Sequence, residues 1–155
     1  MPIDLIKMVR LFGRRVALED MGIMLQPQEF PPRNCFYLDD EQNPVVAAGA
    51  VDQVVFSYQV PEFRKGVLRR LAVEPLDPAG IPSIRWSIRR SGSPVQTYQN
   101  EQAPIGTLGV PDTVYVEFDR QQLLEVIVSN VAAFPFDLYV RVVAWFWDVV
   151  DVSGR

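Results

Sequence analysis

The residues that most often carry catalytic chemistry are scarce in this sequence, and their spacing does not suit it. Histidine is absent from the 155 residues, which removes the commonest general base and excludes histidine-based triads and zinc sites. Acidic residues adjoin one another at Asp39, Asp40 and Glu41, and again at Glu19 and Asp20. Adjacent acids on an exposed segment do not flank a substrate at the separation that glycoside hydrolysis needs. We therefore expect no catalytic residues.

Motifs that hold phosphates or metal ions are also missing from the sequence. Neither GxGxxG nor GxxxxGK[ST] occurs, and the segment IGTLG at residues 105–109 lies in a proline-flanked loop. The run DDEQN at residues 39–43 lacks the alternating oxygen ligands and the central glycine of an EF-hand loop. The sequence thus predicts neither a cofactor nor a metal site.

Composition and charge narrow the class of protein. Hydrophobic residues make up 48% and charged residues 22%, which is ordinary for a globular domain. The net charge of -4 gives no general field for nucleic acid, which is therefore not an expected partner. No apolar run approaches the roughly 20 residues of a membrane helix, and no signal peptide is recognisable. With a single cysteine, Cys35, we expect a water-soluble protein of a cytosol or of a particle assembled there.

Residues 1–50 differ in character from the rest of the chain. Residues 19–50 include four prolines, at positions 27, 31, 32 and 44, which favours an extended N-terminal arm. Apolar residues near the start recur at helical spacing, which predicts a short amphipathic helix near residues 3–12, with a strand as the alternative. These apolar residues are Leu5, Ile6, Val9 and Phe12.

The densest basic patch of the chain lies in the same segment. It consists of Lys7, Arg10, Arg14 and Arg15. Such a patch could contact acidic protein, or nucleic acid inside a particle, or could be the solvated side of the arm.

From residue 51 onward the hydrophobic period becomes two, which is the period of a β-strand. In the clearest case Ile84, Trp86 and Ile88 point one way and the residues between them the other, and Ser91-Gly92 offers a tight hairpin turn. Short strands separated by turns predict an all-β fold, an antiparallel jelly-roll-like sandwich of about seven to eight strands over residues 51–150. Residues 151–155 would form a C-terminal tail. The first alternating segment, residues 54–60, predicts a strand with four residues on one face: Val54, Phe56, Tyr58 and Val60.

The last predicted strand is apolar on both faces. The core of the sandwich can cover only the first face. The opposite face would have to be covered by the N-terminal arm or by another protein. Tyr139, Trp145 and Trp147 on this opposite face could contact protein or stack on a sugar, and packing within the same subunit is the alternative. The first face comprises Leu138, Val140, Val142, Ala144 and Phe146.

The order of these segments resembles that of a known group of proteins. QVPEFRKGVLRRLAV is followed by IRWSIRRSGSPVQTY, VPDTVYVEF, VIVSNVAAF and YVRVVAWFWD. This layout, over residues 51–150, is similar to that of small β-sandwich accessory proteins in the virions of tailed bacteriophages. The resemblance implies a virion location, in capsid decoration or cement or at the neck or tail, usually as a symmetric oligomer whose terminal arm holds a neighbour. The N-terminal segment has no match in this resemblance.

The resulting hypothesis is a non-enzymatic structural component of a phage virion. Its partners would be capsid, neck or tail proteins and further copies of itself, and a chain without residues 1–45 should fold but not assemble. The alternative is a carbohydrate-binding module of a phage tail or surface protein. The residues expected to make contacts are Leu5, Ile6, Val9, Phe12, Arg14, Arg15, Tyr139, Trp145 and Trp147.

Overall fold

The structure of this protein is a computed structural model, and it describes residues 35–107 and 109–149. No helix among these residues is long and apolar enough to cross a membrane. In chain order the elements are β1 (Cys35–Gln42), β2 (Val45–Val46), β3 (Gln53–Gln59), β4 (Arg64–Pro75), η1 (Pro78–Ser83), β5 (Ile84–Arg90), β6 (Ser93–Pro94), η2 (Gln96–Tyr98), β7 (Glu101–Gln102), β8 (Asp112–Phe118), β9 (Leu123–Asn130) and β10 (Phe136–Asp148).

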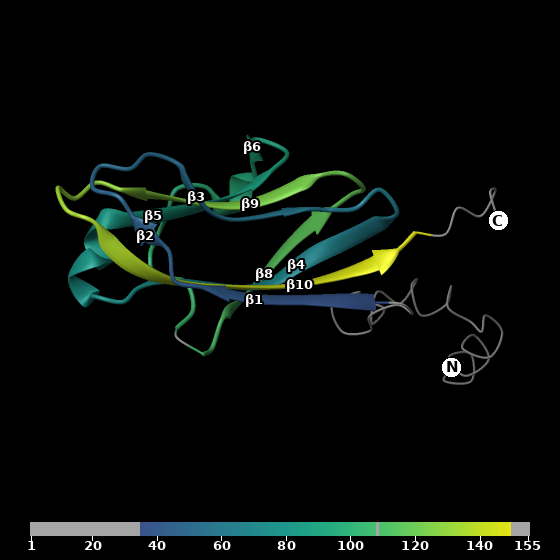
Figure 1. Cartoon of the computed structure of the whole chain (residues 1–155), viewed down its shortest axis with the longest axis horizontal. Coiled ribbons are helices and arrows are strands. Elements are labelled where there is room, and N and C mark those ends of the chain that lie inside the picture. Colours follow the sequence, from purple (N-terminus) through teal and green to yellow (C-terminus); the bar gives the residue numbers. More distant parts are fainter. Residues whose placement is uncertain (1–34, 108, 150–155) are drawn as a thin grey trace, which may run out of the picture. The chain divides into compact units, whose positions relative to one another are not determined.

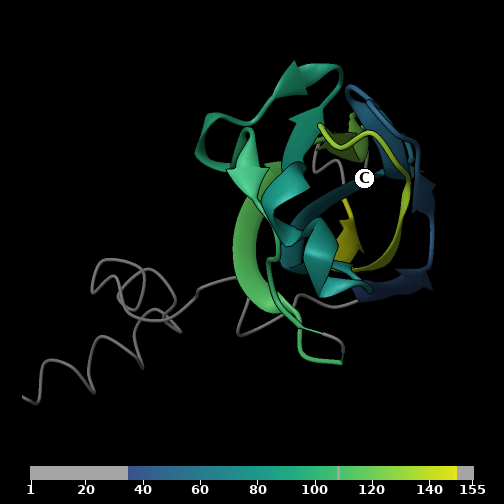
Figure 2. The ribbon, with the colours of Figure 1, turned by 90° about the vertical axis from the view of Figure 1, so that its left-hand side faces the viewer.

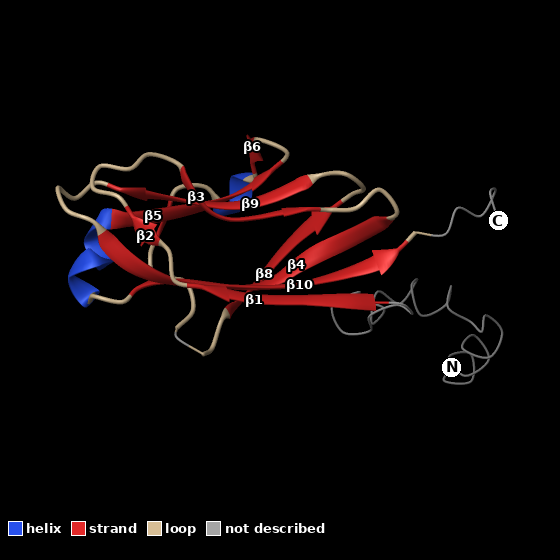
Figure 3. Ribbon diagram, in the orientation of Figure 1, coloured by secondary structure: helices blue, strands red, loops and turns tan. Residues whose placement is uncertain are grey.

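The strands form two antiparallel sheets that lie face to face (Figures 1 and 3). The first has the order β1-β10-β4-β8, with β2 paired to β10, and the second has the order β3-β9-β5-β6, with β7 paired to β5. Each connection from β3 to β4, β4 to β5, β8 to β9 and β9 to β10 passes from one sheet to the other. This interleaving is that of a jelly roll, so the predicted all-β sandwich is confirmed.

The core lies between the sheets and is filled by alternate side chains of each strand. Ile84, Trp86 and Ile88 of β5 are buried, as the alternation in the sequence predicts. The two-residue hairpin after β5 is also confirmed, because Ser91 and Gly92 both have positive φ and Arg90 pairs with Ser93. The inward residues of β10 are buried as predicted: Leu138, Val140, Val142, Ala144 and Phe146.

The prediction for β3 is wrong by one residue at its start. In the pairing with β9 the register passes from Val54 to Phe56, so Val55 is an extra, bulged residue. A bulge reverses the alternation that precedes it. Val54 is consequently 47% exposed on the outer face, whereas Val55 is 5% exposed and joins the core beside Phe56.

Sheet structure begins before residue 51. The segment Cys35–Gln42, which the sequence analysis assigned to the arm, pairs with β10 along its whole length, and Val45 and Val46 pair with the start of β10. A truncation that tests the arm must therefore end before Cys35, because removal of residues 1–45 would also delete β1. Six of the predicted contact residues lie outside the described residues: Leu5, Ile6, Val9, Phe12, Arg14 and Arg15.

One glycine of β4 makes room for Phe146, the largest fully buried side chain among the described residues. Gly66 pairs with Phe146 of β10, and a Cβ atom at Gly66 would lie 2.0 Å from Phe146 Cδ1 and 2.8 Å from the carbonyl oxygen of Trp145. Phe146 is fully buried and makes ring contact with Tyr58 of the opposite sheet, at 4.9 Å between centroids. The Phe146 ring thus bridges the two layers across a position that only glycine fits.

We expect Gly66→Ala to lower the free energy of unfolding by about 1–3 kcal/mol, because an added methyl group must displace a ring that is packed on every side. Urea unfolding followed by tryptophan fluorescence measures this loss. The matched comparison is Gly66→Ala combined with Phe146→Leu, which removes the clash. The double variant should lose less stability than the sum of the two single variants, and simple additivity would contradict the proposed contact.

Candidate functional site

Aromatic side chains gather on the outer face of the β1-β10-β4-β8 sheet. Tyr37 of β1 pairs directly with Trp145 of β10, and these two rings meet edge to face with centroids 5.6 Å apart. Tyr115 lies on β8, on the far side of β4 from Trp145. We call Tyr37, Arg69, Tyr115 and Trp145 the aromatic face.

Arg69 of β4 connects the rings on either side of it. Its guanidinium carbon lies 5.6 Å from the centroid of the Trp145 ring and 5.8 Å from that of Tyr115. In the ladder with β10, neighbouring residues Val143 and Ala144 pair with Arg70 and Leu68, so Arg69 is a bulged residue of the central strand. The ladder with β8 is also irregular between Leu68 and Arg70, but there the extra residue lies on β8. The bulge thereby places a cation between two aromatic side chains, an arrangement that the ring quadrupoles favour.

The aromatic face is partly accessible to solvent. Tyr37 is 55% exposed and Tyr115 is 39% exposed, whereas Trp145 is half-buried. The Tyr115 hydroxyl donates a hydrogen bond to Glu117 at 2.8 Å. Burial, and then this bond to a carboxylate, raise the pKa of Tyr115, so its hydroxyl remains a neutral donor. The face therefore combines exposed rings with fixed polar groups.

An ion pair beside the aromatic face joins β1 to β10. The Arg141 guanidinium donates from Nε and Nη2 to the two carboxylate oxygens of Asp39, both at 2.9 Å, and Nε also lies 3.5 Å from Glu41. Chiefly through the hydrogen bonds from Arg141, the pKa of Asp39 is lowered from its usual range. Arg141 further donates to the carbonyl of Gly109 at 3.4 Å, which connects the strand to the loop before β8.

The three predicted contact residues of β10 do not share one environment. Tyr139 is 5% exposed and lies beside Glu74 of β4, so it is covered within the described part of the chain. Trp147 is half-buried between Cys35 and Lys65. Trp145 alone joins the aromatic face, with partners from three other strands that the sequence analysis did not select.

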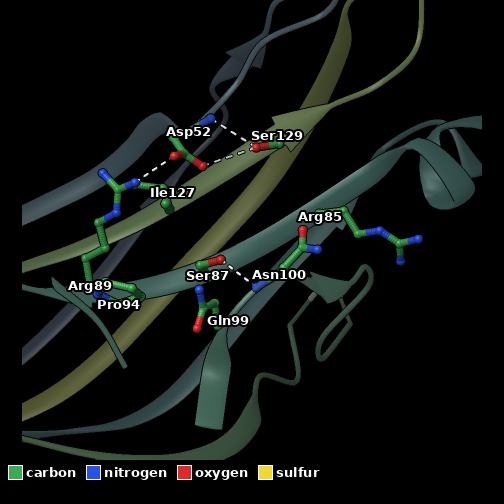
Figure 4. Close-up of a pocket in the computed structure, with 9 residues that line it drawn as sticks. All are labelled: Asp52, Arg85, Ser87, Arg89, Pro94, Gln99, Asn100, Ile127 and Ser129. Carbon is green, nitrogen blue, oxygen red and sulfur yellow. Dashed lines mark hydrogen bonds and ion pairs between the residues drawn. The ribbon is translucent and has the colours of Figure 1, made fainter. Parts of the chain in front are cut away.

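A polar hollow lies on the outer face of the other sheet (Figure 4). Its volume is about 270 Å³. Arg89 donates to Asp52 at 2.7 Å, the Asp52 N–H donates to the Ser129 hydroxyl at 3.0 Å, and the Asn100 N–H donates to the Ser87 hydroxyl at 2.7 Å. These bonds join the walls of the hollow to one another, as the dashed lines in Figure 4 show. The lining residues are Asp52, Arg85, Ser87, Arg89, Pro94, Gln99, Asn100, Ile127 and Ser129.

The hollow contains none of the predicted contact residues. Among residues 35–107 and 109–149, no three side chains of histidine, cysteine, aspartate or glutamate gather in a way that could hold a metal ion. The hollow lies over β5 and β9. Its floor includes the outward residues Arg85, Ser87 and Arg89 of β5. The alternation in the sequence indicates that these three residues face away from the core, but it does not identify Asp52 as the partner of Arg89.

Comparison with known proteins gives little further information. No protein-family model matches the chain, and no curated protein matches it. Among solved structures the chain is similar to one from Bacillus endospore appendages, described as a novel family of disulfide-linked pili. That likeness has a TM-score of 0.34 and 12% sequence identity, and it covers 75% of this chain and 91% of the other.

The ion pair between Asp39 and Arg141 predicts a pH-dependent stability. Because the pKa of Asp39 is lowered by folding, its contribution is present above the unfolded pKa and is lost as the pH falls through the folded pKa. Asp39 is about half exposed, so we expect less than about 1 kcal/mol.

Urea unfolding of the wild type and of Asp39→Asn, from pH 7 down to about pH 2.5, tests this expectation. The stability difference should be largest near pH 7 and should disappear at the acidic end. Asp40→Asn is the matched control, since the Asp40 carboxylate accepts a hydrogen bond from the side chain of Gln42 within its own strand. A difference for Asp39→Asn that stays constant with pH would contradict the role of the ion pair.

Proposed function

We propose that this protein is a non-enzymatic structural subunit that binds neighbouring protein subunits, and that the assembly is a bacteriophage virion. The virion part of the proposal derives from the resemblance in segment order described above. The observation that supports a binding role is the aromatic face, where Tyr37, Trp145 and Tyr115 lie around Arg69 on one side of a continuous sheet.

The residue types of the aromatic face are those that dominate protein interfaces. Tryptophan, tyrosine and arginine are the residues whose truncation costs most in protein–protein binding. Here they are fixed before any partner arrives, because β10 is hydrogen-bonded to β1 on one side and β4 on the other. A surface that is already ordered loses less conformational entropy on binding than a flexible one.

The edge position of β1 adds to this surface. Tyr37 lies on the outermost strand of its sheet, next to Phe36, which is 38% exposed under the guanidinium of Arg64 at 5.1 Å. Exposed rings on an edge strand present both apolar side chains and backbone groups to a neighbour. The acidic residues Asp39, Asp40 and Glu41 occupy the other half of the strand. Charged side chains disfavour pairing with the edge of another sheet, so such pairing is favoured only along the half of β1 that carries the rings.

The geometry is less suited to the carbohydrate alternative. A sugar stacks on an aromatic ring whose face is open, and the guanidinium of Arg69 lies over the Trp145 ring. Tyr37 also meets Trp145 edge to face, so the two rings do not form one flat platform. These contacts favour a protein partner, which can surround the rings from several directions.

The test compares two single substitutions on exposed strand residues. Tyr37→Ser removes a ring from the aromatic face, and Val54→Ser, the matched control, changes a residue on the outer face of the opposite sheet. We expect the full-length wild type to have a mass in solution above 17.6 kDa, or to bind isolated particles. Tyr37→Ser should weaken either interaction at least tenfold, whereas Val54→Ser should not.

Mass photometry and co-sedimentation with purified particles provide the readouts, and thermal unfolding verifies that both variants fold. Equal binding by Tyr37→Ser and wild type would remove the aromatic face from the proposal. Glycan binding that is lost in Trp145→Ala would instead establish the carbohydrate-binding alternative.

A further inference from the structure

The two ends of the sandwich differ in what they present. At one end, where Cys35 pairs with Trp147, strand β1 begins and strand β10 ends (Figure 1). At the other end lie η1 and the turn between β9 and β10, which face the viewer in Figure 2. From Phe136 to Trp147, β10 extends about 36 Å at ~3.3 Å per residue. This distance separates the two ends.

A pocket lined by both apolar and acidic residues occupies the end that carries η1. Its volume is about 340 Å³. Leu76 and Phe134 are 51% and 57% exposed, and the Phe134 ring meets Phe136 edge to face at 5.2 Å. We call this the end pocket, and its lining residues are Leu76, Asp77, Phe134, Pro135, Phe136 and Asp137.

The walls of the end pocket are held by hydrogen bonds. The Asn130 side chain is 1% exposed, donates to the carbonyls of Ala47 and Phe134 at 3.1 and 2.9 Å, and accepts from the Ala132 N–H at 2.9 Å. The Leu76 N–H donates to the carbonyl of Asp137 at 2.9 Å, which joins the two sides of the pocket. The pocket is therefore preformed rather than a gap between loose loops.

The chemistry of the end pocket specifies its occupant. Exposed leucine and phenylalanine side chains next to Asp77 and Asp137 match a segment that is apolar and basic at once. The chain itself contains such a segment at residues 5–15, where apolar residues are interspersed with Lys7 and Arg10 and are followed by Arg14 and Arg15. The apolar residues are Leu5, Ile6, Met8, Val9, Leu11 and Phe12.

We propose that the end pocket binds residues 5–15 of a second copy of this chain, so that copies join head to tail. The proposal rests on the proposed function, in that subunits bind one another, and it names the partner segment. Residues 16–34 can span at most about 65 Å, which is enough to reach a neighbour stacked on the end where Cys35 lies. A donor segment attached at one end and its acceptor at the opposite end form a heterologous contact, which repeats from copy to copy.

The experiment uses full-length chains that each lack one half of the joint. Phe12→Asp disables the donor segment, and Leu76→Asp disables the end pocket. Each variant alone should lose the head-to-tail species of the wild type. An equal mixture should form one-to-one pairs that grow no further through this joint, because the intact arm of Leu76→Asp enters the intact pocket of Phe12→Asp and no second pairing of arm and pocket remains.

Mass photometry across a concentration series identifies these species, with Val54→Asp as a control that should retain the behaviour of the wild type. A mixture that forms no pairs, or a Leu76→Asp variant that assembles like the wild type, overturns the proposal. Monomers throughout, with thermal midpoints lowered in Phe12→Asp and Leu76→Asp but not in Val54→Asp, would show that the segment binds its own pocket, which also overturns it.

The outcome is separable from that for the aromatic face. Pair formation in the mixture together with normal assembly of Tyr37→Ser supports the end pocket and removes the aromatic face. Loss of assembly in Tyr37→Ser, together with a mixture that forms no pairs, supports the aromatic face and removes the end pocket.

Discussion

The structure depends on one strand, β10, that is hydrogen-bonded on both sides along most of its length. Its inward residues fill the core, with Phe146 lying across Gly66 to meet Tyr58 of the other sheet. Its outward residues include Trp145 and Arg141. Trp145 makes a ring contact with the edge strand β1, and Arg141 makes an ion pair with it. Because the same strand supports both faces, the core and the aromatic face cannot vary independently. A change that shifts the register of β10 by one residue would exchange them.

The alternation of apolar residues predicted the main strands from residue 51 onward, but not the irregularities within them. Ile84, Trp86 and Ile88 of β5, and the inward residues of β10, are buried where a period of two places them. The bulges at Val55 and Arg69 could not be predicted in this way, because each arises from the register against a neighbouring strand and not from local sequence. These two residues matter more than their number suggests, since one changes the start of β3 and the other creates the centre of the aromatic face.

The extent of the sheet was also underestimated for a physical reason. Prolines such as Pro44 indicated an arm, and the acidic run Asp39-Asp40-Glu41 indicated an exposed segment, yet both are compatible with an edge strand. Pro44 lies between β1 and β2, where its carbonyl accepts a hydrogen bond from the N–H of Leu138. Charged side chains are tolerated, and even favoured, on the edge of a sheet. Tyr37 could not be recognised as a partner of Trp145 because their pairing joins distant parts of the chain, and a single sequence contains no signal for it.

The aromatic face and the end pocket point in different directions, and that difference limits what the subunits could build. A contact through the side of the sandwich can be isologous, with the same patch on both partners, and then closes at two copies. A contact between an arm at one end and a pocket at the other is heterologous, and it closes only if the rotation between copies completes a ring. A subunit with only the first contact forms pairs, and one with only the second forms a ring or an open row. A subunit with both could connect rows side by side without any change in the sandwich, because Tyr37 and Trp145 lie on a sheet face whereas Leu76 and Phe134 lie at its end.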